Sequence, residues 1–506
     1  MSYIRFQMSQ MPVPQMPERE VIQMRSVETL VGGEWTAGDE WIEVQNPADL
    51  RTPAFRVPAL TPADVTRAYD HAERAFPAWK RTGPLARATV LTAAAALLRE
   101  RADTIAEDIA TENGKTRAEA RGETLKAADF LEYYGLLVGR GGYGTLLNDI
   151  RPDTRTSAQA EPLGVVLAIT PWNDPLITPA RKLAPALAAG NTAVLKPAGE
   201  TPLSGLHLAR ALHDAGLPAG VLNVVTGRTG QISGALLDDP RIAAVTFTGS
   251  NAVGDRLRTA FATRNIRFQG ELGGKNASVV LADADLAKAA RTVVAAAFGQ
   301  AGQRCTATSR VVVERPVHDA FVRLLLAEVA ALRPGAPLAE GTSVGPLSGP
   351  RQRDGVAEHI ERAVKQGATI LAGGDAPADE ALAHGCYLNP TVLGDITDAV
   401  DIWREEVFGP VLAVRAVDSL DDAIAAVNDS DFGLAAAVFT RDLHAAHRFA
   451  DEAECGQIAV NLTTPGWDVH HPFGGFHASG SPFKEQGTEA LHFYTRVKTV
   501  AIHYGA

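Results

Sequence analysis

The feature that most constrains the fold is a repeated alternation of short apolar runs with helical segments. Four runs are rich in β-branched residues and are bounded by turn residues: "GVVLAIT" (164–170), "TAVLKP" (192–197), "VLNVVTG" (221–227) and "AAVTFTG" (243–249). Two of the helical segments between them end at Gly190 and Gly216, and glycine is a typical helix stop. Strands that alternate with helices predict βαβ units around a parallel sheet.

A second series of this kind begins at "NASVVLADADL" (276–286) and continues to about residue 462. A chain of 506 residues is too long for a single hydrophobic core. We therefore expect two α/β domains in tandem. The first is predicted to comprise residues 26–142 and 163–274, and the second residues 275–470.

The segments outside these two series differ from them in composition. Three long amphipathic helices are expected before the first series, at 62–78, 85–113 and 117–137. All five methionines fall within the first 24 residues, so residues 1–25 are expected to be a flexible extension outside the fold. The polar segment 143–162 and the tail 488–506 could pair as a small sheet that leaves the body and contacts another copy of the chain.

Charge and cysteine content argue against several classes of function. The formal net charge is −11 and no basic run occurs, which disfavours nucleic acid or an anionic membrane as the main partner. No apolar run reaches the roughly 18 residues of a membrane span, and the start lacks the apolar block of a signal peptide. The three cysteines are unsuited to a disulfide framework or a zinc site, so we expect a cytoplasmic protein without a metal.

Four polar motifs follow the four strands predicted in the first series: "TPWND", "KPAGETP", "TGRTG" and "FTGSNAVG". Ligands bind where the strands of an open parallel sheet end. Ser250 and Asn251 precede a predicted helix, whose free amide groups could hold a phosphate. The usual dinucleotide signature G-x-G-x-x-G is absent. Because strand ends need turn residues in any case, each motif alone is weak evidence for a site.

Cys305 differs from the other two cysteines in its sequence neighbours. Free cysteines are usually small buried hydrophobes, and Cys386 and Cys455 are interpreted in that way. Cys305 stands instead in the polar stretch "FGQAGQRCTATSR", a setting compatible with a lowered thiol pKa. Glu271 stands in a comparable turn-rich stretch, "QGELGGKNA".

Seven motifs occur in the order and spacing of the aldehyde dehydrogenase superfamily: "PWNDP", "KPAGETP", "FTGS", "ELGGK", "GQRC", "EEVFGP" and "PFGG". The resemblance covers residues 26–500. It implies an α/β fold with two Rossmann-like parallel-sheet domains and a small β extension for oligomerisation, as a homodimer or homotetramer. The implied activity is oxidation of an aldehyde to the carboxylic acid with reduction of NAD(P).

The resemblance also implies roles for three catalytic residues. Cys305 would be the nucleophile that attacks the aldehyde carbon and later carries the thioester. The Asn173 side chain and the backbone N–H of Cys305 would hold the oxyanion. Glu271 would be the general base that activates the hydrolytic water.

The cofactor contacts implied by the resemblance follow the same motifs. Lys196 would approach the adenosine ribose and Ser250 the pyrophosphate, whereas Glu406 would contact the nicotinamide ribose. The complete implied set comprises Ile169, Thr170, Pro171, Trp172, Lys196, Gly199, Glu200, Ser250, Leu272, Glu406 and Phe408. Many members that prefer NAD have a glutamate at the position of Gly199, and here the acid is Glu200 instead. We therefore expect NAD, with NADP left open.

Substrate choice is less constrained by the sequence. Arg181 stands where relatives face the substrate tunnel, so it is a candidate for binding an anionic group, with a helix surface charge as the alternative. Trp467 is a second candidate by position. The C-terminal block resembles that of α-ketoglutaric semialdehyde dehydrogenases, although Gly299 and Phe476 depart from the arginine and the basic residue typical of semialdehyde enzymes.

Three alternatives to a hydrolytic aldehyde dehydrogenase remain at this point. A CoA-acylating relative would generally lack the base, so Glu271 argues against it. A non-catalytic structural member of the fold would be expected to lose Cys305, Glu271 or Asn173, and all three are present. Reduction of an acyl phosphate is the weakest of the three.

Overall fold

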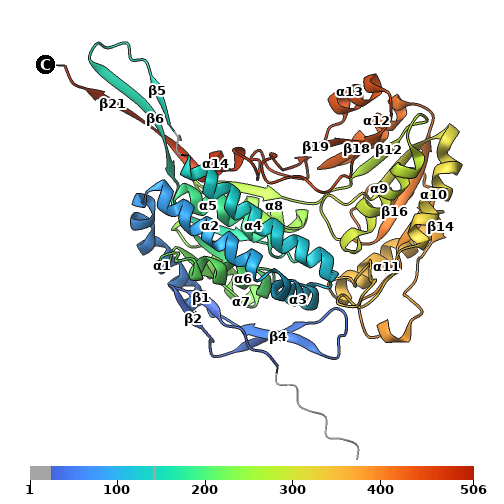
Figure 1. Ribbon diagram of the computed structural model, residues 1–506, viewed down its shortest axis with the longest axis horizontal. Coiled ribbons are helices and arrows are strands. Elements are labelled where there is room, and N and C mark those ends of the chain that lie inside the picture. Colours follow the sequence, from blue (N-terminus) through green and yellow to red (C-terminus); the bar gives the residue numbers. More distant parts are fainter. Residues whose placement is uncertain (1–23, 141–143, 506) are drawn as a thin grey trace, which may run out of the picture.

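The computed structural model describes residues 24–140 and 144–505, so the extension expected over residues 1–25 lies almost entirely outside the described residues. Figure 1 shows two α/β bodies side by side, one coloured blue to green and the other yellow to red, and a β arm that projects from the first. Among the described residues, no helix is long and apolar enough to cross a membrane.

The first body is built on five parallel strands in the order β11-β10-β7-β8-β9. Its strands are β7 (Val165–Ile169), β8 (Thr192–Lys196), β9 (Leu222–Val224), β10 (Ile242–Thr248) and β11 (Arg267–Glu271). The helices between them are α5 (Ile177–Ala189), α6 (Pro202–Asp214), α7 (Thr229–Leu237) and α8 (Asn251–Phe261). The strand order reverses between β7 and β10, and ligands bind at the carboxyl ends of such a pair.

A helical layer covers one side of this sheet (Figure 1). It consists of α2 (Pro84–Glu100), α3 (Ala102–Asn113) and α4 (Arg117–Gly139), which pack with α5 and α6, whereas α1 (Pro62–Arg81) packs with α7 on the opposite face. The single helix expected over 85–113 is wrong, because the chain breaks at Arg101, where φ is −94° and ψ is 10°. The break lets α3 turn so that Ile105 and Ile109 are buried, at 1% and 0% exposure.

The second body contains a seven-stranded sheet in the order β14-β15-β16-β13-β12-β18-β19. Its strands are β12 (Ala277–Val280), β13 (Arg310–Glu314), β14 (Thr369–Ala372), β15 (Thr391–Gly394), β16 (Val411–Val417), β18 (Ala435–Phe439) and β19 (Gln457–Val460). Neighbouring strands are parallel except for β14 and β15. The helices are α9 (Leu286–Phe298), α10 (His318–Ala330), α11 (Pro350–Lys365), α12 (Leu420–Asn428) and α13 (Leu443–Glu452).

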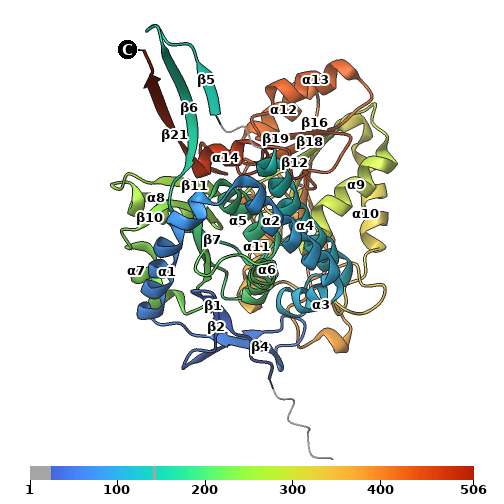
Figure 2. The ribbon, with the colours of Figure 1, turned by 60° about the vertical axis from the view of Figure 1, so that its left-hand side comes forward.

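The projecting arm is a three-stranded antiparallel sheet in the order β21-β6-β5. It is made of β5 (Gly144–Leu147), β6 (Thr154–Pro162) and β21 (Thr495–His503), the last of which follows α14 (Glu489–Tyr494). Figures 1 and 2 both show it extending away from the body. Leu146 and Val497 on this arm are 74% and 73% exposed.

The remaining strands are short and lie at the periphery: β1 (Thr29–Val31), β2 (Glu34–Thr36), β3 (Trp41–Gln45), β4 (Pro53–Pro58), β17 (Phe432–Gly433) and β20 (Phe476–His477). The four 3-10 turns are η1 (Gly299–Gly302), η2 (Arg315–Val317), η3 (Glu380–Leu382) and η4 (Asp401–Trp403) among the described residues. Two parallel-sheet bodies and a small β extension confirm the predicted fold class.

Candidate active site

Cys305 lies in the loop between η1 and β13 and is partly buried. Its carbonyl oxygen accepts a hydrogen bond from Asn276 Nδ2 at 2.8 Å, which fixes the loop against the start of β12. Burial raises the pKa of the thiol to about 12, and the carboxylate of Asp174 adds to the shift. The polar sequence around Cys305, which is compatible with a lowered thiol pKa, is thus accompanied by a raised pKa in the cofactor-free protein. The loop residues are polar, but the thiol faces the interior.

Glu271 is the last residue of β11 and is 2% exposed. Its Oε1 accepts a hydrogen bond from Gln269 Nε2 at 3.0 Å, whereas Oε2 is buried without a hydrogen-bond partner. Burial, reinforced by the nearby carboxylate of Glu485, raises the pKa of Glu271 well above its ordinary value. The raised pKa values of Cys305 and Glu271 favour the protonated form of both side chains at neutral pH.

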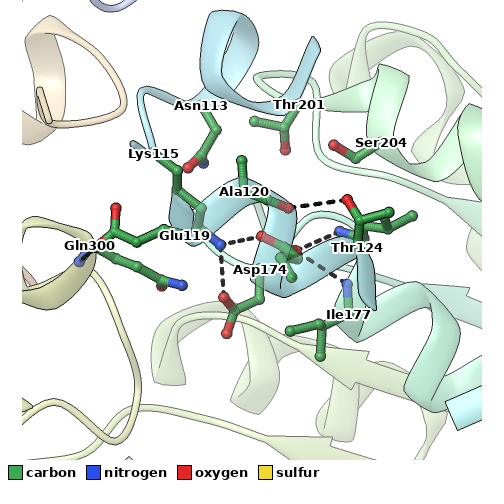
Figure 3. Close-up of polar contacts among 12 residues, drawn as sticks. Asn113, Lys115, Glu119, Ala120, Thr124, Asp174, Ile177, Thr201, Ser204 and Gln300 are labelled. Atoms are coloured by element: carbon green, nitrogen blue, oxygen red, sulfur yellow. Dashed lines mark hydrogen bonds and ion pairs between the residues drawn. The ribbon is translucent and has the colours of Figure 1, made fainter. Parts of the chain in front are cut away.

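Asn173 is 7% exposed and lies in the loop between β7 and α5. The carbonyl of its neighbour Trp172 accepts a hydrogen bond from Asn113 Nδ2 at 2.7 Å. Its other neighbour, Asp174, forms an ion pair with Lys115 at 2.8 Å (Figure 3). The loop that carries the Asn173 amide is therefore held on both sides by residues at the end of α3.

Lys115 pairs with the carboxylate of Glu123 as well as with that of Asp174. Lys115 also forms an ion pair with Glu123, and both side chains are buried. Glu123 Oε1 accepts the backbone N–H groups of Leu176 and Ile177 at 2.8 and 3.1 Å, so it caps the start of α5. Burial opposes ionisation of Asp174, but Lys115 and Arg304 lower its pKa to about 2.

Arg181, on α5, is largely buried and is not a helix surface charge. Its side chain is 13% exposed, and Nη1 lies 3.3 Å from Glu485 Oε2. The guanidinium stacks over the rings of Phe473 and Phe130, at 4.7 and 5.6 Å from their centroids. Its positive charge opposes the upward shift of the pKa of both Cys305 and Glu271, so Arg181 lies near both groups. Nε of Arg181 is buried without a partner.

Sequence reasoning missed Glu485, which is 2% exposed. Its Oε1 forms an ion pair with Lys182, whose Nζ also donates to Thr246 Oγ1 at 2.9 Å. The signal in the sequence was the adjacent pair Arg181 and Lys182 on an otherwise apolar helix. Two adjacent cations on such a helix need a buried anion, but the chain position of that anion follows only from the fold.

The carboxyl ends of β7 and β10 carry two orphaned hydroxyls, Thr170 Oγ1 and Thr248 Oγ1, which are buried without partners. Lys196 ends the next strand, β8, and burial lowers the pKa of its amine to about 8. Ser250 is exposed at the start of α8, and its side chain makes no capping bond. Unpaired polar groups at a strand-order reversal fit a nucleotide, so these residues suit the cofactor that the sequence predicted.

Gly199 lies just beyond Lys196 and borders open space. A Cβ built there meets no atom within 4 Å, so the position has room for a larger side chain or a ligand group. Glu200 is exposed beside it. No local contact thus prevents a 2′-phosphate from approaching Gly199.

The nicotinamide end of the predicted site joins the two bodies. Trp172 and Phe408 make an edge-to-face contact with 5.4 Å between ring centroids. Glu406 Oε1 accepts the backbone N–H of Gly274 at 2.7 Å, and burial raises the pKa of Glu406 to about 7. Leu272 packs so tightly on Gly254 that a Cβ at that glycine would lie 2.6 Å from Leu272 Cδ2.

The remaining predicted residues fall as follows. Ile169 ends β7, and Thr170 and Pro171 lead from it into the Asn173 loop. Trp467 packs against the core of the second body, and its indole N–H donates to the Thr464 carbonyl at 2.8 Å. The structure thus brings Cys305, Glu271 and Arg181 together, with Asn173 on the adjoining loop, whereas no described contact links Trp467 to them. Within residues 24–140 and 144–505, no group of three His, Cys, Asp or Glu residues is placed to hold a metal ion.

Comparison with known proteins places this geometry in a family. The model described as "Aldehyde dehydrogenase family" matches residues 35–500. The alpha-ketoglutarate semialdehyde dehydrogenase of Haloferax volcanii is 41% identical over 479 residues, which cover 94% of this chain and 98% of that protein. The crystal structure of an E. coli NADP dependent enzyme has 36% identity and a TM-score of 0.91, and covers 95% of this chain and 98% of its own. The crystal structure of PnpE in complex with nicotinamide adenine dinucleotide has 34% identity and a TM-score of 0.91. The match covers 95% of this chain and 98% of the PnpE chain. The chain therefore belongs to the aldehyde dehydrogenase family and is an NAD(P)-dependent oxidoreductase that acts on aldehydes.

Proposed function

We propose that the protein oxidises an aldehyde that carries a carboxylate at its far end, a semialdehyde, to the corresponding dicarboxylate. The observation that carries this proposal is the largely buried guanidinium of Arg181 near Cys305 and Glu271, with one N–H, Nε, left without a partner. A buried cation with a free donor favours an anionic ligand. Similarity to the Haloferax semialdehyde dehydrogenase supports the same substrate class.

In the first half of the reaction, the Cys305 thiol releases its proton to solvent water, and the thiolate sulfur attacks the aldehyde carbon. The carbonyl oxygen becomes an oxyanion, which accepts N–H groups from the Asn173 side chain and the Cys305 backbone. A bound NAD(P)⁺ supplies the acceptor for the hydride that leaves this carbon. The carbon then remains attached to Cys305 as a thioester.

In the second half, Glu271 accepts a proton from a water molecule as the oxygen attacks the thioester carbon. The carbon–sulfur bond breaks, the carboxylic acid forms, and the sulfur leaves as a thiolate. Glu271 needs to be ionised for this step, and its raised pKa means that the proton has to be removed first. The buried cations of Lys182 and Arg181 favour that ionised form.

The open space at Gly199 supports use of both NAD and NADP by this chain. A glutamate at that position would repel a 2′-phosphate, whereas the glycine leaves room for one. We propose that NAD is preferred, because exposed Glu200 lies beside the same space and disfavours a phosphate there.

The arm β21-β6-β5 supports assembly as a homodimer or homotetramer. Leu146, Val497 and Ile502 expose 74%, 73% and 59% of their surface on it, which is unusual for apolar residues that face only water. We further propose residues 26–142 and 163–274 as the dinucleotide-binding domain, and 275–470 as the catalytic domain. The three free cysteines support a cytoplasmic location.

The substrate class is tested by steady-state cofactor reduction with aldehydes of matched chain length that end in either a carboxylate or a methyl group. The proposal predicts a kcat/KM at least about tenfold higher for the carboxylated aldehydes, because one charge-assisted hydrogen bond is worth that much. A preference for the methyl-terminated series would refute the semialdehyde assignment, while leaving the family unaffected.

A further inference from the structure

The start of α4 contacts both of the loops that the proposed mechanism uses. Asn113 and Lys115, just before it, hold the loop of Asn173 through the contacts at 2.7 and 2.8 Å described above. Glu119, in its first turn, reaches the other body and contacts η1, which leads directly to Cys305. One short segment of the first body thus lies between the oxyanion amide and the nucleophile loop.

The two carboxylate oxygens of Glu119 accept hydrogen bonds from different parts of the molecule. Oε2 accepts the backbone N–H and the hydroxyl of Thr116, at 3.0 and 2.9 Å, and so closes the capping box of α4. Oε1 accepts the backbone N–H of Gln300 at 2.6 Å. The second bond is not needed for the helix cap and joins the two bodies of the molecule (Figure 3).

The turn that receives this bond is strained. Gln300 and Ala301 have φ angles of 54° and 53°, in the left-handed region that residues with a side chain rarely adopt. Such backbone persists only where surrounding contacts over-determine it. Neither the Nε2 nor the Oε1 atom of Gln300 has a partner, so its side chain does not hold the turn through hydrogen bonds. Its backbone bonds to Glu119 and to the N–H of Gln303, at 3.1 Å, do so instead.

We propose that Glu119 is a positioning residue, which acts through Gln300 to hold the Cys305 sulfur at the correct place relative to the Asn173 amide. The inference rests on the roles proposed for Cys305 and Asn173. Loss of the Glu119–Gln300 bond lets the strained turn relax and moves the nucleophile loop relative to the Asn173 loop. Misplacement of reacting groups by about 1 Å costs up to about 100-fold in rate.

The chain offers a matched control for this residue. Glu119→Ala removes the carboxylate half of the capping box and the bond to Gln300 together, but keeps the bond from the backbone N–H of residue 119 to the Thr116 hydroxyl. Thr116→Ala removes the hydroxyl half of the capping box and leaves Glu119 bonded to Gln300. Oε2 of Glu119 keeps the Thr116 backbone N–H in that variant. Glu119→Gln retains one carbonyl oxygen that can accept the Gln300 N–H, so it serves as the conservative rescue.

The experiment is stopped-flow measurement of cofactor reduction in the first turnover, at saturating aldehyde and NAD, with the full-length protein. We expect Glu119→Ala to slow this turnover by at least about tenfold, Glu119→Gln to recover most of the rate, and Thr116→Ala to stay within about twofold of the parent. The dissociation constant of NAD, measured by fluorescence titration, should be unchanged in all three. Thermal unfolding should show a similar loss of stability for Thr116→Ala and Glu119→Ala.

Equal first-turnover rates in Thr116→Ala and Glu119→Ala would overturn the positioning role and reduce Glu119 to a helix cap. If Glu119→Ala does not fold, Glu119→Asp takes its place, because an aspartate closes the equivalent capping box of α1 at Asp64 but is one methylene too short to keep the bond to Gln300. A first turnover of Glu119→Asp within about twofold of Thr116→Ala refutes the proposal, and one at least about tenfold slower supports it. Asn173→Ala is measured in parallel. An unchanged first turnover in that variant would instead refute the underlying assignment of the oxyanion amide.

Discussion

Replacement of Arg181 by methionine tests how the site selects its substrate. Methionine fills a similar volume between the Phe130 and Phe473 rings but provides no donor. Lys182 keeps its ion pair with Glu485, so the substitution leaves no unpaired buried carboxylate. Hydrogen bonds to charged groups contribute about 1.5 to 3 kcal/mol. This range corresponds to a loss of about 10- to 150-fold in kcat/KM for a carboxylated aldehyde.

The assay is ultraviolet detection of NADH with a carboxylated and a methyl-terminated aldehyde of equal length. Arg181→Met is expected to reduce kcat/KM much more for the carboxylated aldehyde than for the other. Arg210→Met is the matched control, because Arg210 also stacks on an aromatic ring, Trp35, at 3.4 Å, but on a different part of the molecule. Equal losses of kcat/KM for both aldehydes in Arg181→Met would show that Arg181 stabilises the fold or the thiolate form of Cys305. This result would refute its role in binding the substrate carboxylate.

Further substitutions and a pH series test the chemistry of the site. Cys305→Ala should abolish NADH formation while circular dichroism and NAD binding stay those of the parent protein; measurable turnover would remove Cys305 from the mechanism. Glu271→Gln should form NADH in the first turnover but slow the steady state, seen as a burst, and a steady rate equal to that of the parent would count against the assignment of Glu271 as base. Gly199→Glu should raise KM for NADP more than KM for NAD, and a uniform change would contradict the proposed role of that open space. Because the thiol pKa is raised to about 12, the thiolate fraction should grow with pH, so alkylation of Cys305 by iodoacetamide in the cofactor-free protein should accelerate by about tenfold per unit between pH 7 and 10; a plateau below pH 9 would show a lower pKa.

The fold was largely predictable because its strands are local signals. The buried strands β7, β8, β10 and β18 are continuous apolar runs, as strands covered on both faces have to be, and turn residues mark their ends. The break between α2 and α3 was not predictable, because the residues around Arg101 favour helix on both sides. The edge strand β14 was expected within "ATILAGG" of the second series, but its antiparallel direction was not, since strand direction depends on its distant partner β15.

The candidate site was only partly predictable. Resemblance to the motifs of the aldehyde dehydrogenase superfamily assigned Cys305, Glu271 and Asn173, whereas local composition set apart only Cys305, through its polar sequence neighbours. Burial and charge pairing depend instead on residues far apart in the chain. The pairing of Arg181 with Glu485, separated by 304 positions, could not be found from the sequence. The raised pKa of Cys305 has the same origin, because neighbouring residues in the sequence do not show which side of the loop faces the interior.

The covalent step can be observed on the protein itself. Glu271→Gln is mixed with NAD and a carboxylated aldehyde, quenched with acid within the first turnover, digested and analysed by mass spectrometry. A Cys305 thioester requires the peptide that contains Cys305 to gain the mass of the acyl group, while the peptides of Cys386 and Cys455 stay unmodified. Cofactor reduction without any adduct on Cys305, or with the adduct on another cysteine, would contradict the proposed mechanism.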